Sequence, residues 1–352
     1  KTYTYNSSDG IIDVTGGANV NMPVPAVKGF AYLDGVTYIM DEEANIHGCD
    51  DANSPKLWTD ALNKLVAQIE PDRGVALMKQ LVYVIAFKQW STEVFFDAGN
   101  AVGSPLGAVQ GAKVSYGCVS ADSIAGIDGM LFWVGSNQSS SIQVAKLEGL
   151  KAEPVSTDPV ERLLSNADFS TVYSMAFKNE SHRFYLITVV EANLTLVYDI
   201  DQRMWAQWTD THGNYFPFVA VTYATGSQPL FQHESNGRIY TLGADHYSDD
   251  TEAITVDIIT PNFDGETNRR KQLAMMKFVA DRVEGSVLQV RKNDWDYAAD
   301  KWSNFRQVDL SQLQPSLANC GTFVRRAHHL RHQSNTSFRI RAIELQMDLG
   351  AL

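Results

Sequence analysis

Residues 171–208, TVYSMAFKNESHRFYLITVVEANLTLVYDIDQRMWAQW, contain four short runs that are rich in apolar, aromatic and β-branched residues. The runs occupy residues 171–178, 183–190, 194–199 and 204–208. Such side chains are enriched in strands, and links as short as these join antiparallel neighbours. The stretch therefore predicts one meander of four antiparallel strands.

The same arrangement recurs on both sides of this meander. Residues 30–40 and 123–134 each contain two strand-like runs joined by an Asp-Gly pair, at Asp34 and Asp128. Asp-Gly favours the positive φ angles of a two-residue hairpin turn. Groups of three or four strands recur at intervals of roughly 45–60 residues, which is typical of the blades of a β-propeller. A large β-sandwich is the alternative fold.

Helical signals are few. Residues 54–69 place several Leu and Val residues at helical spacing, so we expect part of this segment to be helical. In residues 158–166, Asp158 is a candidate N-cap and Pro159 lies at the first helical position, where its missing N–H costs nothing. We expect both helices to connect blades.

The composition changes around residues 249–270, and longer strand-like runs follow. We therefore predict an all-β chain in three parts. These are an N-terminal segment (1–26), a β-propeller-like body (27–248) and a C-terminal β domain or extension that packs on the propeller (249–352). The chain begins at Lys1 without a Met, so we expect that further residues precede it.

The composition is that of a folded globular protein. Hydrophobic residues make up 44% of the 352 residues and charged residues 20%. No apolar run approaches the roughly 18 residues that a membrane helix needs, so we expect no membrane contact. Cys49, Cys118 and Cys320 are too few and too far apart for a disulfide framework or a CxxC metal pair, which fits assembly in a reducing cytosol.

The net charge of −12 is unevenly distributed along the chain. Residues 269–341 hold 14 Lys and Arg against 6 Asp and Glu, so the rest of the chain carries a net charge of −20. We expect an acidic body and a basic C-terminal region that face different neighbours. Chance clustering of charges on solvated faces is the alternative.

Catalytic motifs are missing from the sequence. It contains no GxSxG, HExxH, GxGxxG or Walker sequence, so we predict that the protein is not an enzyme and has no cofactor. His328, His329 and His332 lie in a strand and turn context, where residues four apart are about 13 Å apart. We therefore expect a partner interface or a solvated turn at these histidines, and no metal site.

Two sets of charged residues are candidates for binding. Arginine suits carboxylates and phosphates alike, and a pI near 5.1 argues against a general DNA-binding protein. We therefore favour an acidic partner protein over DNA for the first set, which is Arg325, Arg326, Arg331, Arg339 and Arg341. The second set is acidic and comprises Asp41, Glu42, Glu43, Asp249, Asp250 and Glu252. The carboxylates around Asp41 lack the alternating ligands and central Gly of a calcium loop.

Four tryptophans, Trp90, Trp133, Trp205 and Trp208, lie at or beside the predicted strand ends. We favour the interpretation that they fill the cores of blades, and a sugar-binding platform is the alternative. A carbohydrate-binding propeller, such as a receptor-binding lectin, is therefore the alternative function.

Ten segments, taken in order, resemble the packaged-DNA stabilisation proteins of short-tailed (podovirus-type) phages, which are tail hub or nozzle proteins. The segments are GVAL (74–77), VYVIAF (82–87), WSTEVFFDAGN (90–100), GSPL (103–106), GC (117–118), DGMLFW (128–133), LTLVYD (194–199), WAQW (205–208), LRHQSN (330–335) and FRIRAIEL (338–345). The resemblance covers most of the chain from about residue 27 onward, and no single segment is diagnostic on its own.

The resemblance implies a β-propeller subunit in a sixfold ring below the portal and adaptor proteins of the virion. Such a ring retains packaged DNA, carries the tail needle, fibres or tailspikes, and forms the conduit for genome ejection. It implies no catalytic residues, and assembly in the host cytoplasm. A tube for DNA must not hold phosphates, so we expect the acidic set to line the channel, and double-stranded DNA to pass without sequence-specific binding. The alternative is that these carboxylates only keep the outer surface soluble.

Overall fold

The structure is a computed structural model that describes most of the chain. The described residues are 3–6, 10–13, 25–49, 58, 64–67, 70–100, 103–112, 114–139, 141–223, 228–243 and 245–350, with the backbone alone for 3–6 and 10–13. Most of these residues lie in antiparallel strands, so the prediction of an all-β chain is confirmed. No helix among them is long and apolar enough to cross a membrane.

The chain divides into two compact units. The first unit, called the body here, comprises Lys1–Thr209 and Asn214–Leu242. The second unit, called the C-terminal unit, comprises Asp210–Gly213 and Gly243–Leu352. The sequence analysis placed the start of the C-terminal domain at residue 249, and the second unit begins its continuous part at Gly243.

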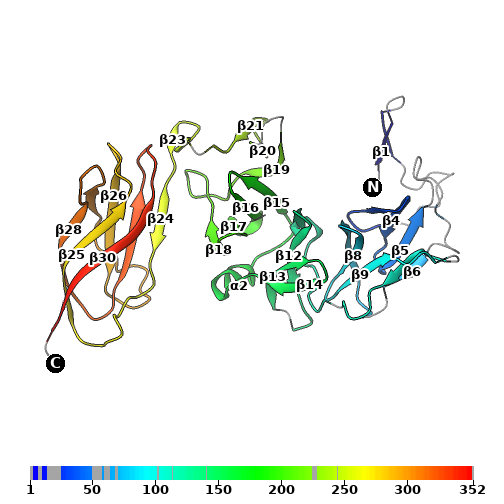
Figure 1. The fold of residues 1–352 in the computed structure, drawn as a ribbon, viewed down its shortest axis with the longest axis horizontal. Helices are drawn as coiled ribbons and strands as arrows, with labels where there is room; N and C mark the ends of the chain where they lie inside the picture. Colours follow the sequence, from blue (N-terminus) through cyan, green and yellow to red (C-terminus); the bar gives the residue numbers. More distant parts are fainter. Residues whose placement is uncertain are drawn as a thin grey trace. The chain divides into compact units, whose positions relative to one another are not determined.

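In the described part of the body, five antiparallel sheets follow one another in chain order, and each is a meander of consecutive strands (Figure 1). Sheet I contains β3 (Ala31–Leu33), β4 (Val36–Met40), β5 (Asn45–Cys49) and β6 (Lys64–Val66). Sheet II contains β7 (Gly74–Gln80), β8 (Tyr83–Lys88), β9 (Thr92–Asp97) and β10 (Leu106–Ala108). Sheet III contains β11 (Ala125–Ile127), β12 (Met130–Ser136), β13 (Ile142–Glu148) and β14 (Lys151–Pro154). Sheet IV contains β15 (Val172–Asn179), β16 (His182–Val189), β17 (Leu194–Asp199) and β18 (Met204–Gln207). Sheet V contains β19 (Phe218–Tyr223), β20 (Pro229–His233) and β21 (Ile239–Thr241). A separate hairpin, β1 (Tyr3–Asn6) and β2 (Gly10–Asp13), precedes sheet I.

The first turn of each of sheets I to IV begins with the same backbone conformation. A residue with positive φ follows the first strand in each case, namely Asp34 (46°), Leu81 (52°), Asp128 (50°) and Glu180 (54°). The two Asp-Gly hairpins were predicted. The predicted strand 81–87 began too early, because Leu81 and Val82 form the turn and are 61% and 62% exposed. The left-handed backbone conformation costs a leucine about 1–2 kcal/mol. A turn is therefore not expected at Leu81 when turns are predicted from Gly and Asp.

Neighbouring sheets of the body share cores. One cluster joins sheets I and II, a second joins II and III, a third joins III and IV, and a fourth joins IV and V. Between sheets II and III, the fully buried Trp133 packs edge-on against Phe87 with ring centroids 5.1 Å apart. A strand that faces a core on both sides needs apolar residues at successive positions, which explains the run MLFWVG in β12.

One α-helix is described, α2 (Asp158–Leu164), between sheets III and IV. The predicted N-cap is wrong, because Thr157 occupies that position and Asp158 lies in the first turn, where its charge favours the helix dipole. Val160 and Leu164 anchor the helix in the core of sheets III and IV. The described residues also include two short 3-10 helices, η1 (Ala121–Ser123) and η2 (Val190–Ala192). Most of the predicted helix 54–69 lies outside the described residues, but residues 64–66 form strand β6 instead.

The C-terminal unit is a sandwich of two sheets over one core. One sheet has the order β24 (Val256–Ile259), β29 (Ala327–His332), β26 (Val287–Asn293) and β27 (Arg306–Asp309). The other has the order β28 (Ser316–Phe323), β25 (Lys271–Ala280) and β30 (Ile340–Leu349). Leu273 and Phe278 of β25 meet Leu288 and Val290 of β26 in the core. A small hairpin, β22 (Ser248–Asp249) and β23 (Glu252–Ala253), precedes the sandwich.

The three histidines of β29 are buried, so the expectation of an interface or a solvated turn is wrong. His328, His329 and His332 are 6%, 3% and 2% exposed. His332 Nε2 lies 2.9 Å from Ser286 Oγ, and His329 Nε2 bonds to the carboxylate of Asp257. His328 Nε2 has no hydrogen-bond partner, and burial, assisted by the nearby Arg326, lowers the pKa of His328 to about 4.

A buried ion triad holds one end of sheet II together. Lys88 Nζ lies 2.5 Å from Glu93 Oε1 and 2.9 Å from Asp72 Oδ1, and it donates to the carbonyl of Glu70. The three charged side chains are each at most 2% exposed. Asp72 also accepts hydrogen bonds from the backbone of Trp90 and Ser91, so the triad fixes the turn between β8 and β9.

We predict that Lys88→Met lowers the free energy of unfolding by about 3–5 kcal/mol, because it leaves two buried carboxylates without their cation. The matched control is Lys146→Met, since Lys146 pairs with Glu153 at 2.9 Å near the surface of sheet III. This change is expected to cost less than about 1 kcal/mol. Urea unfolding curves measure both values, and equal losses in the two variants contradict the prediction.

We predict that acid destabilises the chain before its carboxylates titrate. The pKa of His328 is lower in the folded state (about 4) than in the unfolded state (about 6.5), so unfolding takes up a proton between these values. Stability is therefore lost as pH falls from 6.5 towards 4, by up to about 3 kcal/mol. His328→Leu removes most of this dependence and leaves a part from His332, whose pKa is also lowered by burial. An unaltered pH profile in His328→Leu refutes the assignment.

Candidate functional site

The predicted arginine set lies in the C-terminal unit, and most of its members already have a carboxylate partner. Arg325, Arg331 and Arg339 form surface ion pairs within the unit, and Arg341 is exposed on β30. The pairs are Arg325–Asp296 at 2.7 Å, Arg331–Asp257 at 2.8 Å and Arg339–Asp281 at 2.9 Å. Each partner lies at least 29 residues away in sequence, so only the fold brings these charges together.

Arg326 differs from the rest of the set because it is fully buried. Its guanidinium contacts Asp294 at 2.5 Å, donates to the carbonyl of Cys320, and lies 4.3 Å from the ring centroid of Phe323. The side chain therefore fixes the turn before β29 and is not available to a partner. The sequence pattern places arginines at the surface, so the sequence analysis did not predict the structural role of Arg326.

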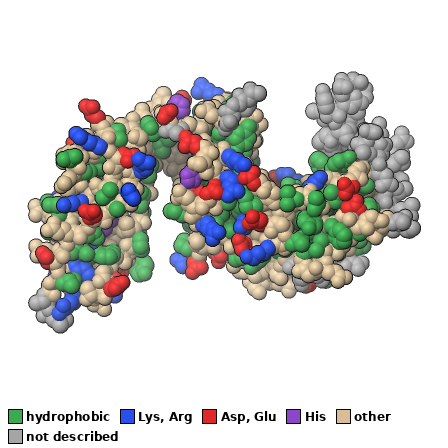
Figure 2. Space-filling model, in the orientation of Figure 1, with side chains coloured by type: hydrophobic (Ala, Val, Ile, Leu, Met, Phe, Trp, Pro, Cys, Tyr) green, Lys and Arg blue, Asp and Glu red, His purple; other side chains and the backbone are tan. Residues whose placement is uncertain are grey.

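The charge of the C-terminal unit depends on where its boundary lies. Residues 243–352 hold 14 Lys and Arg against 15 Asp and Glu, a net charge of −1, and residues 1–242 carry −11. The predicted contrast between an acidic body and a basic C-terminal region is thus smaller than the window 269–341 indicated. Basic and acidic side chains are interspersed on the face drawn in Figure 2.

Asp41, the first member of the acidic set, is 7% exposed and has an internal role. Its carboxylate accepts hydrogen bonds from the backbone and side-chain nitrogens of Asn45, both at 2.8 Å, and lies 2.9 Å from His47 Nε2. Burial raises the pKa of Asp41, but the hydrogen bonds from His47 and Asn45 outweigh burial and hold the pKa below its usual value. Asp41 therefore closes the turn between β4 and β5 and is not presented to a channel.

The other acidic residues lie at the surface or partly exposed in turns. Glu42 and Glu43 are exposed at the tip of the turn that Asp41 closes. Asp249, Asp250 and Glu252 belong to the hairpin β22–β23 of the C-terminal unit, where Asp249 is opposite Glu252. The acidic set is thus divided between the two units.

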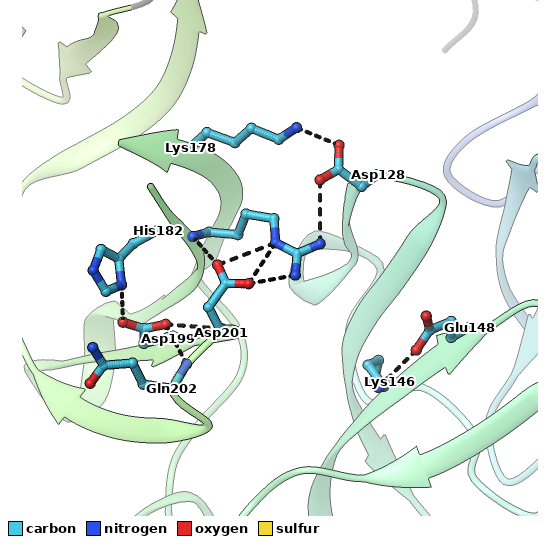
Figure 3. A network of polar contacts seen from close by, with 9 residues as sticks. Asp128, Lys146, Glu148, Lys178, His182, Asp199, Asp201 and Gln202 are labelled. Atoms are coloured by element: carbon cyan, nitrogen blue, oxygen red, sulfur yellow. Dashed lines mark hydrogen bonds and ion pairs between the residues drawn. The ribbon is translucent and has the colours of Figure 1, made fainter. Parts of the chain in front are cut away.

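A polar network that the sequence analysis missed connects sheets III and IV (Figure 3). Asp128, in the first turn of sheet III, pairs with Lys178 at 2.7 Å and with Arg183 at 3.5 Å. Arg183 also binds Asp201 in the last turn of sheet IV. The hydrogen bond from Lys178, with help from Arg183, lowers the pKa of Asp128, so its carboxylate stays charged in mild acid. The only sequence signal for this network was the Asp-Gly turn itself.

Sheets II and III are also connected by polar contacts, and here the side chain is uncharged. The side-chain amide of the buried Gln80 donates to the carbonyls of Gly129 at 2.7 Å and Leu147 at 3.0 Å. Polar side chains at or beside the first turn of a sheet therefore fix both junctions next to their apolar cores. Gln80 of sheet II fixes the junction with sheet III, and Asp128 of sheet III fixes the junction with sheet IV. This arrangement aligns neighbouring sheets in register.

Three of the four tryptophans have a structural role, as the sequence analysis favoured. Trp133 is buried and donates to the carbonyl of Gly117, and Trp205 donates to the carbonyl of Val155. Trp208 packs against Phe177 and Phe184 of sheet IV and against Phe216, which precedes β19. Trp90 is 38% exposed and lines an open pocket with Arg73, Glu42 and Asn137. Among these four described tryptophans only Trp90 is exposed, so they do not form the repeated sugar platform that the lectin alternative requires.

The described residues contain no group of three or more His, Cys, Asp or Glu side chains that could hold a metal ion. Asp50 and Asp51, which flank the acidic turn in the sequence, lie outside the described residues. Cys49, Cys118 and Cys320 are buried and unpaired by disulfides, and burial raises the pKa of the Cys118 thiol to about 12. These thiols are therefore core side chains rather than nucleophiles.

Comparison with solved structures gives weak overall similarity. The nidogen/laminin complex matches at 14% identity and a TM-score of 0.35, over 62% of this chain and 75% of the other. Regucalcin, a calcium-binding protein of Agrobacterium tumefaciens strain C58, matches at 11% identity and a TM-score of 0.34, over 65% and 72%. BamB of Moraxella catarrhalis matches at 9% identity and a TM-score of 0.33, over 88% and 85%. TM-scores below 0.5 do not establish a shared fold, so the fold assignment depends on the sheets and on the family.

Comparison of the sequence with protein families gives a clear result, although no curated protein sequence matches. The family described as bacteriophage P22 Gp10, β-propeller, matches residues 3–247. The match covers sheets I to V, so the meanders of the body are propeller blades, as predicted. The family also confirms the resemblance found in the sequence and identifies the chain as a structural component of a phage particle. The chain therefore belongs to the phage stabilisation family of P22 Gp10.

Proposed function

We propose that this protein is a subunit of the tail hub, a ring below the portal and adaptor proteins that retains packaged DNA and forms the conduit for genome ejection. The observation that carries the proposal is the family match over residues 3–247. The continuous cores between sheets I and V support it, because a wall around pressurised DNA needs a rigid body. We expect six copies in the ring, assembled in the host cytoplasm.

The charge of the body supports passage of DNA without retention by the wall. Residues 1–242 carry a net charge of −11, and a ring multiplies this value by the number of subunits. Basic side chains on the inner surface bind phosphates and release counterions, whereas carboxylates repel the duplex. In the proposal Glu42 and Glu43 of the body, with Asp249, Asp250 and Glu252 of the C-terminal unit, line the channel. Asp41 is excluded because it is buried.

We expect the partners to be further copies of this chain, the portal and adaptor proteins, and the tail needle, fibre or tailspike proteins. Arg325, Arg331, Arg339 and Arg341 are the arginines that remain for a contact with an acidic partner. A partner carboxylate must replace an internal ion pair at three of them, so each exchange contributes only about 0–1 kcal/mol. Such weak contacts predict a monomer in dilute solution that becomes a ring on its adaptor.

We predict that particles assembled without this protein package DNA and then lose it. The genome per particle that resists DNase is expected to fall at least about tenfold, and purified wild-type chain added to the extract restores it. The variant Lys146→Met, which removes the ion pairs with Glu148 and Glu153 near the surface, restores it equally well. Particles that retain their DNA without the chain exclude the proposed role.

We predict that the double variant Glu42→Lys and Glu43→Lys makes assembled tails hold DNA. The slope of log K against log salt should steepen by about 0.9 for each lysine that contacts a phosphate. Filter binding of duplex DNA to tails at several salt concentrations measures the slope.

The matched control has the same change of charge at the opposite end of the sheets, Glu148→Lys with Glu180→Lys. It should leave the slope unchanged. If both double variants bind DNA alike, or neither does, then Glu42 and Glu43 do not line the channel.

A further inference from the structure

The loop between β26 and β27 of the C-terminal unit exposes two aromatic rings. Trp295 is 65% exposed and Tyr297 is 97% exposed. Among the described residues, no partner accepts a hydrogen bond from the indole N–H of Trp295 or from the hydroxyl of Tyr297. Tyr297 also has a φ of 59°, a left-handed conformation that is unfavourable for a residue with a side chain. A strained backbone that holds an aromatic ring in water indicates a binding role for this loop.

Hydrogen bonds within the C-terminal unit fix the shape of this aromatic loop. The side chain of the buried Asn293 accepts from the backbone N–H of Trp295 at 2.9 Å and donates to the carbonyl of Ala298 at 2.6 Å. Arg325, in the turn before β29, pairs with Asp296 at 2.7 Å. A loop that is ordered before binding loses little conformational entropy on contact with a partner. Trp, Tyr and Arg are the residue types enriched among the dominant contacts of protein interfaces, and the loop region presents all three.

The aromatic loop lies at the end of the sandwich away from the point where the chain enters it. The chain enters through β24, whose first residue Val256 is opposite His332 of β29. The loop follows Asn293, which is opposite Ala327 at the other end of β29. The five residue steps between these points along β29 span roughly 17 Å. The loop is therefore presented at the end of the unit that the incoming chain does not cover.

The body has a groove whose chemistry matches this loop, at one end of sheet II. The groove has a volume of about 670 Å³ and is lined by Val82, Phe96 and Val109, with Asp34 and Asp97 at its rim. Val82 is 62% exposed and Phe96 is 39% exposed. None of the lining residues is Lys or Arg, and neither carboxylate has an ion-pair partner among the described residues. An exposed apolar surface with unpaired carboxylates at its rim fits apolar side chains that carry hydrogen-bond donors.

We propose that the aromatic loop of one copy docks in this groove on the body of the next copy in the tail ring. The inference rests on the proposed function, because that ring brings copies of the chain side by side. Tyr and Trp combine an apolar ring with one hydrogen-bond donor. In the docked state the rings of Trp295 and Tyr297 cover the apolar floor, and their donors face the carboxylates of Asp34 and Asp97. Arg325 adds a cation beside this acidic rim.

The occupant of the groove is a second copy because the two surfaces differ and complement each other. A contact between two different surfaces of one chain repeats head to tail, and it closes into a ring when the rotation fits. Each copy then offers its loop to one neighbour and its groove to the other. The position of the loop, at the end of the sandwich away from the incoming chain, leaves it accessible to such a neighbour.

Disulfide cross-linking in assembled tails tests the proposal. Four double variants combine Val82→Cys or Gln110→Cys in the groove with Trp295→Cys or Tyr297→Cys in the loop, all at exposed positions. Mild oxidation is expected to join successive copies in at least one variant, so that a non-reducing gel shows dimers and higher multiples up to the full ring. The three native cysteines are buried, so wild-type tails are the blank.

The matched control combines Tyr297→Cys with Gln138→Cys, which is exposed in the turn between β12 and β13 of sheet III. This pair is expected to give no multiples. Four test variants without multiples overturn the proposal, and so do cross-linked monomers or a link from the loop to a different virion protein. A reducing gel separates the two levels of the argument. Wild-type chain that is absent from tails overturns the proposed function as well, whereas wild-type chain that is present confines the failure to this inference.

Competition for assembly gives a second measurement that needs no cross-link. An assembly extract receives equal amounts of wild-type chain and one variant, and mass spectrometry of the tails gives their ratio. Tyr297→Ala is expected to lower the variant's share at least about tenfold, as the loss of an anchor residue does, and Tyr297→Phe restores most of it because the ring remains. The matched control Leu313→Ala, at a side chain that is 84% exposed in the turn between β27 and β28, should compete equally with the wild type. Equal incorporation of Tyr297→Ala and wild type overturns the proposal.

Discussion

The constraint on which the rest of the structure depends is that each inner sheet of the body has two faces to bury and only its neighbours to bury them against. Sheet III packs one face on sheet II and the other on sheet IV. Its central strand must therefore be apolar at successive positions, and Trp133 and Phe132 point into different cores. Specific alignment then has to come from the ends of the strands, where Gln80 and Asp128 make directed polar contacts. Apolar packing supplies the adhesion between the sheets, and the polar side chains fix how they are aligned.

The strands could be predicted from sequence because alternation, apolar runs and Asp-Gly turns are local signals. The meander of sheet IV was predicted with its boundaries correct to within one or two residues, because its turns are short. One error arose where a residue contradicts its usual preference, because Leu81 adopts a left-handed turn. The other arose where the local pattern fits two positions. Thr157 and Asp158 are both suitable N-cap residues, and Thr157 precedes helix α2.

The charged residues were the least predictable part of the molecule. Lys88, Lys271 and Arg326 are completely buried, although sequence patterns place such residues at the surface. Lys271 is satisfied by three backbone carbonyls and Arg326 by Asp294, which is 32 residues away. A sequence shows the charge but not the partner, and the partner decides whether a side chain is structural or free to bind. For this reason the arginine and carboxylate sets could be proposed from the sequence, but Arg326 and Asp41 had to be removed from them.

The order in which the sheets pack has a consequence for how the protein is made. Sheets I to V share cores only with sheets adjacent in sequence among the clusters described, so each core forms between segments that leave the ribosome one after the other. Every completed sheet offers a finished apolar face to the next one as it emerges. Long-range loop closure, which slows the folding of most β proteins, is thereby divided into short steps. Synthesis and folding can advance together along the body, and the nascent chain exposes one unfinished face at a time.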